Sequence, residues 1–290
     1  MNTVYFDAKI DDDVRRAHLY AGQLFVYFAS PCAMELCRLG RELAEAAFAP
    51  LDPREAQYSM TVETYAAILA ELKPKFIHHP KAKACIQGIL REAGCDLEQT
   101  YFDVPRMRTS TAGGYLTTGI AYAFHPHRDT WYSAPMCQLN WWLPIYELES
   151  ENAMAFHPRY WNQPIRNGSD GYNYQEWVRT SRFVAAQQIK TDTRKQPQAE
   201  AAIELEPQTR VITPPGGLLI FSAAHLHSSV PNTARQTRFS IDFRTIHLGD
   251  VLTNQGAPNL DSACTGTTLG DYLRGSDLAH VPEEIIARYL

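Results

Sequence analysis

The pattern of hydrophobic residues changes near residue 100. Before that point, apolar residues recur at helical spacing in PCAMELCRLGRELAEAAF (31–48), VETYAAILAEL (62–72) and KAKACIQGILREAG (81–94), which predicts three amphipathic helices. The run GQLFVYF (22–28) is apolar without that spacing and predicts a buried strand. We therefore expect the first third of the chain to be rich in helix.

After residue 100, short β-rich runs follow one another, and several alternate between apolar and polar residues. We expect strands in YFDVPRM (101–107), YLTTGIAYAF (115–124), CQLNWWLPIY (137–146), NAMAFHP (152–158), TRVITP (209–214), GLLIFSAA (217–224) and RFSIDFRTIHL (238–248). Regularly spaced short strands are typical of an antiparallel sandwich or barrel of the jelly-roll type. The predicted fold class is α+β, with the helices packed on a jelly-roll core.

The division of the chain follows from the same pattern. No linker rich in Pro, Ser or Gly separates the halves, so we predict one domain over residues 1–290. It would comprise a helix-rich part (1–100), a jelly-roll core (about 101–250) and a C-terminal tail (251–290). Residues 159–206 are polar, rich in Tyr and Trp and partly helical in pattern. An insert of this length usually forms a lid or binding loop, and a mobile surface excursion is the alternative.

Composition narrows the choice of partners. The net charge is −5 and no stripe of Lys and Arg is present, which argues against a nucleic-acid partner. The N-terminal residues do not form a secretory signal, and no apolar stretch approaches the ~20 residues of a membrane span. The six cysteines lack CxxC spacing, which favours free thiols in a reducing compartment. We expect a cytoplasmic monomer or homodimer that acts on a small molecule.

The stretch AFHPHRDTWY, which begins at Ala123, concentrates imidazole and charged groups. His127 and Asp129 are two residues apart, so on a strand they would project to the same side. Non-haem Fe(II) sites commonly use two histidines and one carboxylate and leave three positions open. A third ligand is available in PPGGLLIFSAAHLHSSV, where an apolar strand is expected to end in His225 and His227.

A cationic strand follows the distal histidines. Arg238 lies eleven residues after His227 and opens the strand RFSIDFR, where alternation places Arg238 and Ser240 on one face. An inward guanidinium would bind a dicarboxylate in bidentate fashion, and the serine hydroxyl would add a donor. Counted from His225, the eleventh residue is Gln236, which carries no charge. On the residues alone, His225 and His227 both stay open as the third ligand.

The order of these motifs resembles the Fe(II)/2-oxoglutarate-dependent oxygenases. The form H-S-S-x-x-N-x(5)-R is most similar to the phytanoyl-CoA dioxygenase-like branch, and the resemblance covers roughly residues 100–247. It implies a double-stranded β-helix core with iron held by His127, Asp129 and His227. It also implies that 2-oxoglutarate chelates the iron and pairs with Arg238. In halogenating relatives a small residue replaces the carboxylate ligand, so the presence of Asp129 disfavours halogenation.

The resemblance also implies the reaction. Such an enzyme consumes O2 and 2-oxoglutarate, releases succinate and CO2, and hydroxylates its primary substrate by default. Desaturation, ring formation or dealkylation would use the same residues. The aromatic and cationic residues of the 159–206 insert favour a small polar, anionic or zwitterionic metabolite, such as an amino-acid derivative or a natural-product intermediate.

Further residues are expected near this site. Gln138 and Asn140 share one face of a predicted strand, and we expect them to contact 2-oxoglutarate or the substrate. Amides satisfied within the barrel would give the same pattern. We expect five other side chains to contact the substrate, although ordinary packing is the alternative for each: His125, Trp131, Tyr132, Tyr174 and Trp177.

Three other interpretations use the same residues. His125 and His127 also form the HxH of cupins, but the glutamate that cupins need a few residues later is missing from RDTWYS. A non-oxidative isomerase or hydrolase with another metal would have no need of Arg238 as a dicarboxylate anchor. A non-catalytic jelly-roll binding protein would tolerate the loss of any one ligand, whereas all three are present.

Overall fold

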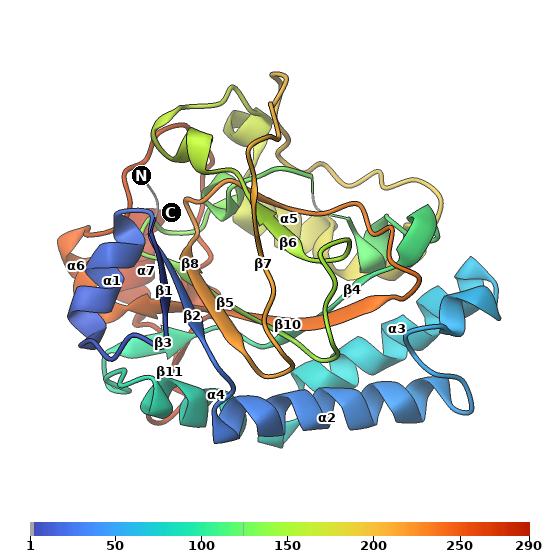
Figure 1. The fold of residues 1–290 in the computed structure, drawn as a ribbon. Coiled ribbons are helices and arrows are strands. Elements are labelled where there is room, and N and C mark those ends of the chain that lie inside the picture. The colour runs from blue at the N-terminus through green and yellow to red at the C-terminus, as the bar shows by residue number, and fades with distance from the viewer. Residues whose placement is uncertain (1–2, 124) are drawn as a thin grey trace.

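Two β-sheets face each other at the centre of the computed structural model, which describes residues 3–123 and 125–290 (Figure 1). The larger sheet contains β1 (Val4–Phe6), β2 (Leu24–Tyr27), β3 (Thr100–Phe102), β4 (Arg106–Ser110), β5 (Leu139–Pro144), β8 (Leu218–Ser222), β10 (Arg238–His247) and β11 (Leu273–Arg274). The smaller sheet contains β6 (Met154–Phe156), β7 (Thr209–Val211) and β9 (His227–Ser229).

The order of the strands defines a double-stranded β-helix. The larger sheet runs β1-β2-β8-β5-β10-β3-β11, with β4 also paired to β10, and the smaller runs β7-β6-β9. An isolated bridge from His127 to His227 extends the smaller sheet beyond β9. From β4 onward the chain therefore passes repeatedly between the two sheets. This topology confirms the predicted α+β class with a jelly-roll core.

The α-helices of the described chain are α1 (Asp12–Tyr20), α2 (Pro31–Phe48), α3 (Val62–Ile77), α4 (Pro80–Glu92), α5 (Tyr174–Thr180), α6 (Leu248–Thr253) and α7 (Glu283–Ile286). The predicted helix over 31–48 is confirmed with the same bounds. It begins there because the Ser30 hydroxyl accepts a hydrogen bond from the amide of Ala33 and because Pro31 suits the first helical position. None of the described helices is long and apolar enough to cross a membrane.

The helices α2, α3 and α4 cover the outer face of the larger sheet, as Figure 1 shows. Alternation along β8 directs Leu218 and Ile220 to the core beneath these helices. The same alternation directs Leu219 and Phe221 to the core between the two sheets. Gly88 allows α4 to approach α2 closely, because a Cβ atom there would lie 2.3 Å from the Sγ atom of Cys32.

The predicted strand over 115–124 is wrong for the residues that the structure describes. Residues 115–123 form turns and a 3-10 helix, η3 (Gly119–Ala121), and residue 124 lies outside the described chain. Gly119 has a φ of +58°, and a Cβ atom there would lie 2.3 Å from the carbonyl oxygen of Ala185 and 2.5 Å from that of Gln188. This segment packs closely against the insert, which is distant in sequence, and does not pair as a strand. The local alternation of apolar and polar residues could not indicate that packing.

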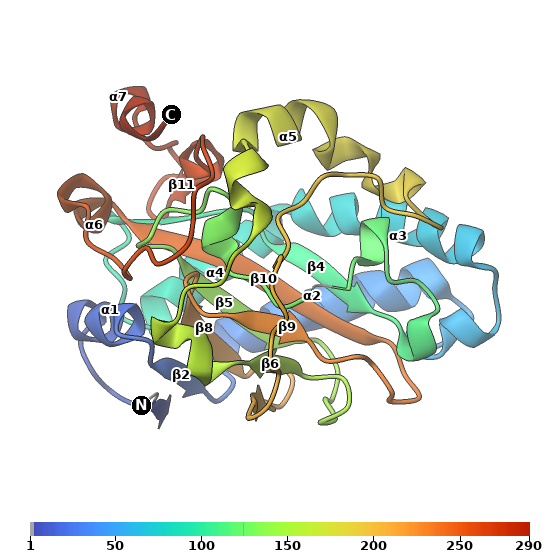
Figure 2. The same cartoon turned by 90° about the horizontal axis from the view of Figure 1, so that it is seen from above.

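The insert and the C-terminal segment are joined side by side, as the view from above in Figure 2 shows. Hydrogen bonds join the two segments, and the first four of these pairs follow in parallel order: Ile165 with Asp261, Ser169 with Ala263, Asn173 with Thr265, Gln175 with Thr267, and Tyr174 with Asp271. We call this row of contacts the insert seam. The predicted tail thus packs on the insert, and β11 adds a strand beside β3.

Candidate metal centre

The structure brings together the three side chains that the sequence predicts as metal ligands. One ligand atom from each of His127, Asp129 and His227 lies within 4.8 Å of the other two, and all three groups are buried. The Nε2 atom of His127 lies 3.3 Å from Oδ1 of Asp129, and Nε2 of His227 lies 4.0 Å from the same oxygen. Two imidazole nitrogens and one carboxylate oxygen suit a divalent non-haem iron.

The local structure of the ligands differs from the prediction. His127 forms only the isolated bridge, and Asp129 begins a 3-10 helix, η4 (Asp129–Tyr132), so the HRD segment is not a continuous strand. His227 begins β9, after a turn that follows β8. The ligands nevertheless converge because the bridge fixes His127 directly opposite His227.

Backbone carbonyl groups orient both histidine rings. The Nδ1 atom of His127 lies 2.8 Å from the carbonyl oxygen of His125, and Nδ1 of His227 lies 2.9 Å from that of His225. When Nδ1 carries the proton and donates it, the lone pair of Nε2 is directed to the common centre. Burial, with the neighbouring charge of His127, lowers the pKa of His227 to about 4. The ring is therefore neutral at pH 7, as a metal ligand must be.

Two amides hold the carboxylate ligand. The Oδ2 atom of Asp129 accepts hydrogen bonds from Asn140 Nδ2 at 2.8 Å and from Gln138 Nε2 at 3.3 Å. The Tyr272 hydroxyl in turn donates to Oε1 of Gln138 at 2.7 Å. These contacts leave Oδ1 of Asp129 directed to the histidines. The amides predicted to contact 2-oxoglutarate or substrate thus have Asp129 as their partner here, and a contact with either small molecule stays a prediction.

The charge of Asp129 is stabilised by its surroundings. Burial would raise the pKa of this carboxyl, but its contact with His127 and the charge of Arg244 hold its pKa below the ordinary value. The guanidinium Nε atom of Arg244 lies 3.8 Å from Oδ2. An ionised oxygen is therefore available to a cation at neutral pH.

His225, the alternative third ligand, is directed elsewhere. Its Nε2 atom lies 3.0 Å from the carbonyl oxygen of Gly22, and its ring centroid is 4.5 Å from that of Trp161. Burial lowers the pKa of His225 to about 3, which keeps the imidazole neutral. This residue joins β8 to the N-terminal segment and is not part of the ligand cluster.

A cavity extends from the ligands into the barrel, and we call it the Arg238 cavity. Its described lining includes His127, Asp129, His227, Trp142, Met154, Phe221 and Arg238. Arg238 Nη1 donates to the carbonyl oxygens of Asn152 and Ala153, while its Nε atom has no hydrogen-bond partner within the described chain. Burial lowers the pKa of Arg238 to about 10, so it remains a cation.

Ser240 lies on the same face of β10 as Arg238 and is fully buried. Among the described residues its hydroxyl has no hydrogen-bond partner. Buried donors without partners are rare and costly, and an anion that accepts from them removes the cost. Ser240 is not among the described residues that line the Arg238 cavity, so it is the buried Nε donor of Arg238 that fits this end of the cavity to a carboxylate.

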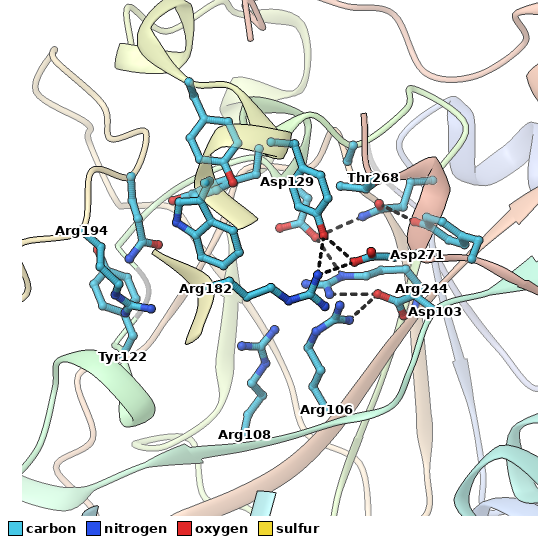
Figure 3. Close-up of a pocket in the computed structure, with 18 of the residues that line it drawn as sticks. Asp103, Arg106, Arg108, Tyr122, Asp129, Arg182, Arg194, Arg244, Thr268 and Asp271 are labelled. Atoms are coloured by element: carbon cyan, nitrogen blue, oxygen red, sulfur yellow. Dashed lines mark hydrogen bonds and ion pairs between the residues drawn. The ribbon is translucent and has the colours of Figure 1, made fainter. Parts of the chain in front are cut away.

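A second cavity opens on the other side of Asp129, and we call it the arginine cavity (Figure 3). The two cavities share Arg108, Gly119, Tyr122, Asp129 and Arg244, so they meet at the candidate metal centre. Three of the aromatic residues expected around the substrate line the arginine cavity: Tyr132, Tyr174 and Trp177.

The other two expected contacts lie elsewhere. Trp131 is fully buried, donates from Nε1 to Asp261 at 2.8 Å and is not among the described residues that line either cavity, which matches the alternative of ordinary packing. Its side chain packs with Ile165 and Leu226. His125 is exposed and is not among the described residues that line either cavity. The carbonyl oxygen of His125, and not its imidazole, contacts the site, because it is the partner of Nδ1 of His127.

Sequence reasoning missed the arginines that line the second cavity: Arg106, Arg108, Arg182, Arg194 and Arg244. A signal for the first two was present in RMRTS, where alternation places Arg106 and Arg108 on one face of β4. Arg182 and Arg194 come from the insert, and no local pattern indicates where their side chains end.

No family model matches the sequence, and none of the curated proteins compared with it matches. Among solved structures, the chain is similar to EvdO2 from Micromonospora carbonacea var. aurantiaca complexed with 2-oxoglutarate, with 13% identity, 83% of this chain and 92% of that chain covered, and a TM-score of 0.47. It is also similar to the epimerase SnoN in complex with Fe3+, alpha ketoglutarate and nogalamycin RO, with 15% identity, 81% and 85% covered, and a TM-score of 0.40. The non-heme monooxygenase ThoJ matches with 14% identity, 74% and 68% covered, and a TM-score of 0.36.

Proposed function

We propose that this protein is an Fe(II)- and 2-oxoglutarate-dependent oxygenase that oxidises a small polar metabolite, with hydroxylation as the default outcome. One observation carries the proposal: two Nε2 atoms and one carboxylate oxygen converge beside a cavity whose far end holds a buried arginine with an unpartnered donor among the described residues. A metal-dependent isomerase or hydrolase would need the first feature and not the second.

The residues divide the work between the two cavities. His127, Asp129 and His227 would hold the iron, and Arg238 would receive the carboxylate of 2-oxoglutarate remote from it. The bound metal supplies, with O2 and 2-oxoglutarate, the oxidising equivalents for breaking a C–H bond, and succinate and CO2 leave. Asn140 and Gln138 keep Oδ1 of Asp129 directed to the centre. The arginine cavity would orient the primary substrate against this centre and limit the access of water.

Replacement of Arg238 tests the proposal. Arg238→Met removes a charge-assisted contact to a buried carboxylate, a loss of about 2–5 kcal/mol, so the Kd of 2-oxoglutarate should rise more than tenfold. The Kd is measured by anaerobic titration calorimetry on the Fe(II)-loaded protein. Fe(II)-dependent release of succinate from 2-oxoglutarate, followed by chromatography, should fall in parallel at limiting 2-oxoglutarate.

Arg210→Met is the matched control, because Arg210 is an exposed arginine on β7. It should leave both values unchanged. Arg238→Lys keeps a cation but loses the guanidinium fork, so an intermediate affinity is expected. An unchanged Kd in Arg238→Met, or the absence of Fe(II)-dependent succinate release from the unaltered protein, would contradict the proposed function.

A further inference from the structure

The arginine cavity receives cations from two parts of the chain that are far apart in sequence. Arg106 and Arg108 occupy alternate positions on β4, in the wall of the barrel. Arg182 begins the 3-10 helix η7 (Arg182–Gln187) of the insert. Figure 3 shows Arg106 and Arg108 pointing from β4 into the cavity, while Arg182 extends toward them from the opposite side.

Carboxylates hold the guanidinium groups of the barrel side in place. Arg106 forms an ion pair with Asp103, and Arg244 lies 3.2 Å from the same carboxylate. The Nε atom of Arg108 donates to Asp242 at 2.6 Å. A guanidinium has five donors in a fixed fork, so a single carboxylate does not engage every N–H group of Arg106 or Arg244.

The insert side is built in the same way. Arg182 Nη1 lies 3.0 Å from Asp271 and 3.2 Å from the Tyr174 hydroxyl, and its side chain remains 26% exposed. Arg194 pairs with Asp192 at 2.6 Å. The acidic partners thus orient the arginines around the cavity and do not fill it.

The balance of charge around the cavity stays the same when the centre is loaded. In the apoprotein, the five lining arginines are matched by five nearby carboxylates: Asp103, Asp129, Asp192, Asp242 and Asp271. Bound Fe(II) would add two positive charges and the 2-oxoglutarate dianion two negative charges, which cancel. An entering anion would therefore be bound by directional N–H groups of the guanidinium forks and not by an excess of charge.

Aromatic groups occupy the remaining wall. Tyr132 and Tyr172 contact each other with ring centroids 5.5 Å apart, and Tyr174 stacks on Trp177 at 6.3 Å. The Nε1 donor of Trp177 is buried and has no hydrogen-bond partner in the described parts of the chain. Flat apolar surface beside a free donor suits an aromatic or unsaturated molecule that carries a polar acceptor.

We infer that the primary substrate carries a carboxylate, phosphate or sulfate group, which binds between Arg106 and Arg108 of β4 and Arg182 of the insert. Its aromatic or unsaturated body lies against Tyr174 and Trp177. The bound anion bridges the barrel and the insert, so substrate entry itself draws the insert onto the cavity. This inference names the substrate class for the proposed function. The binding of an anion does not depend on the proposed reaction, but its description as the substrate does.

The test compares acids with their neutral counterparts. The protein loaded with Fe(II) and 2-oxoglutarate without O2 is titrated with benzoate and benzamide, phenylacetate and phenylacetamide, and phenyl phosphate and phenol. We expect at least one acid to bind about tenfold or more tightly than its neutral counterpart. Arg182→Met and Arg106→Met should each weaken binding of that acid about tenfold or more and leave the neutral compound unaffected.

Arg166→Met is the control, because Arg166 also belongs to the insert but is 78% exposed and pairs with Glu200. It should not change the affinity for the acid. Arg182→Lys should restore part of it, which separates a charge effect from damage to the insert. Equal affinity for every acid and its neutral counterpart, no binding of any acid, or an unchanged affinity in Arg182→Met would overturn the inference.

The same titrations separate this inference from the proposed function. If acids bind and depend on Arg182 while the Kd of 2-oxoglutarate does not depend on Arg238, the anion site stands and the proposed reaction fails. If 2-oxoglutarate binding depends on Fe(II) and Arg238 but acids bind no more tightly than amides, the proposed reaction stands and the anion site fails.

Discussion

At the residue scale, strand alternation and spacing predicted which side chains form the candidate metal centre. They predicted the contacts of the neighbouring side chains less well. His127, Asp129 and His227 could be selected because the order HxD, distal histidine and arginine restricts the choice. Trp131 could not be placed, because its partner Asp261 lies 130 residues away and a 3-10 turn intervenes. Alternation holds only where the backbone is extended.

The amide of Asn140 gives a prediction at this scale. Asn140→Ala removes the shorter of the two amide hydrogen bonds to Asp129, so the carboxylate is freer to rotate away from the histidines. Partners of this kind typically contribute 10–100-fold to metal affinity. We expect the Kd for Fe(II) to rise within that range, measured by competition with a chelator of known affinity.

Asn259→Ala provides the comparison, because this exposed asparagine bonds only within its own turn among the described residues. It should bind Fe(II) like the unaltered protein. If Asn140→Ala also binds Fe(II) normally, Asp129 is held by the backbone alone and the amide has no positioning role.

At the element scale, helices with regular periodicity were predicted within a few residues, as α2 and α4 illustrate. The single predicted strand over 101–107 divides into β3 and β4 near Pro105, which has no amide hydrogen for the ladder. The composition of residues 159–206 was enough to predict an insert. The insert seam was not predictable, because its hydrogen bonds join residues roughly a hundred positions apart in sequence and no local pattern indicates them.

Asp271 gives the prediction for the insert, since it accepts from both Tyr174 and Arg182. Asp271→Asn weakens two charge-assisted hydrogen bonds that fasten α5 and η7. Amide hydrogen exchange over residues 174–187 should become several-fold faster, while exchange in β5 and β10 stays unchanged. Mass spectrometry of peptic fragments measures both.

Asp277→Asn serves as the reference variant, because Asp277 is an exposed carboxylate in the same segment and pairs with Arg274. Its exchange should match that of the unaltered protein. Equal rates over 174–187 in Asp271→Asn would mean that the insert is held by its apolar contacts and not by this carboxylate.

At the scale of the whole molecule, one buried arginine joins the barrel, the insert and the C-terminal segment. Arg128 lies between two of the metal ligands and donates to the carbonyl oxygens of Ala224, Tyr160 and Gln163. Its Nε atom lies 3.1 Å from Asp261, and the two side chains are 2% and 5% exposed. The sequence shows that Arg128 is a charged residue in the HRD segment, but nothing in it indicates that Asp261 is its partner.

Loss of that partner should be costly. Asp261→Leu leaves the guanidinium of Arg128 buried without a carboxylate, and breaking a buried pair in this way costs about 3–5 kcal/mol. We expect a corresponding fall in the free energy of unfolding, measured by urea denaturation followed by fluorescence. The double variant Arg128→Met with Asp261→Leu should recover much of it, because no unpaired charge remains. A loss below about 1 kcal/mol in Asp261→Leu would show that the carbonyl oxygens alone satisfy Arg128.

The insert seam has a consequence for how selectivity can be exchanged between related proteins. A graft of residues 159–206 alone would arrive without the groups that Ile165, Asn173 and Gln175 contact in the C-terminal segment. An exchange of the insert that keeps these hydrogen bonds therefore has to include residues 261–271 from the same parent protein. Under the proposed function, a chimera that exchanges only one of the two segments should fold less stably than one that exchanges both.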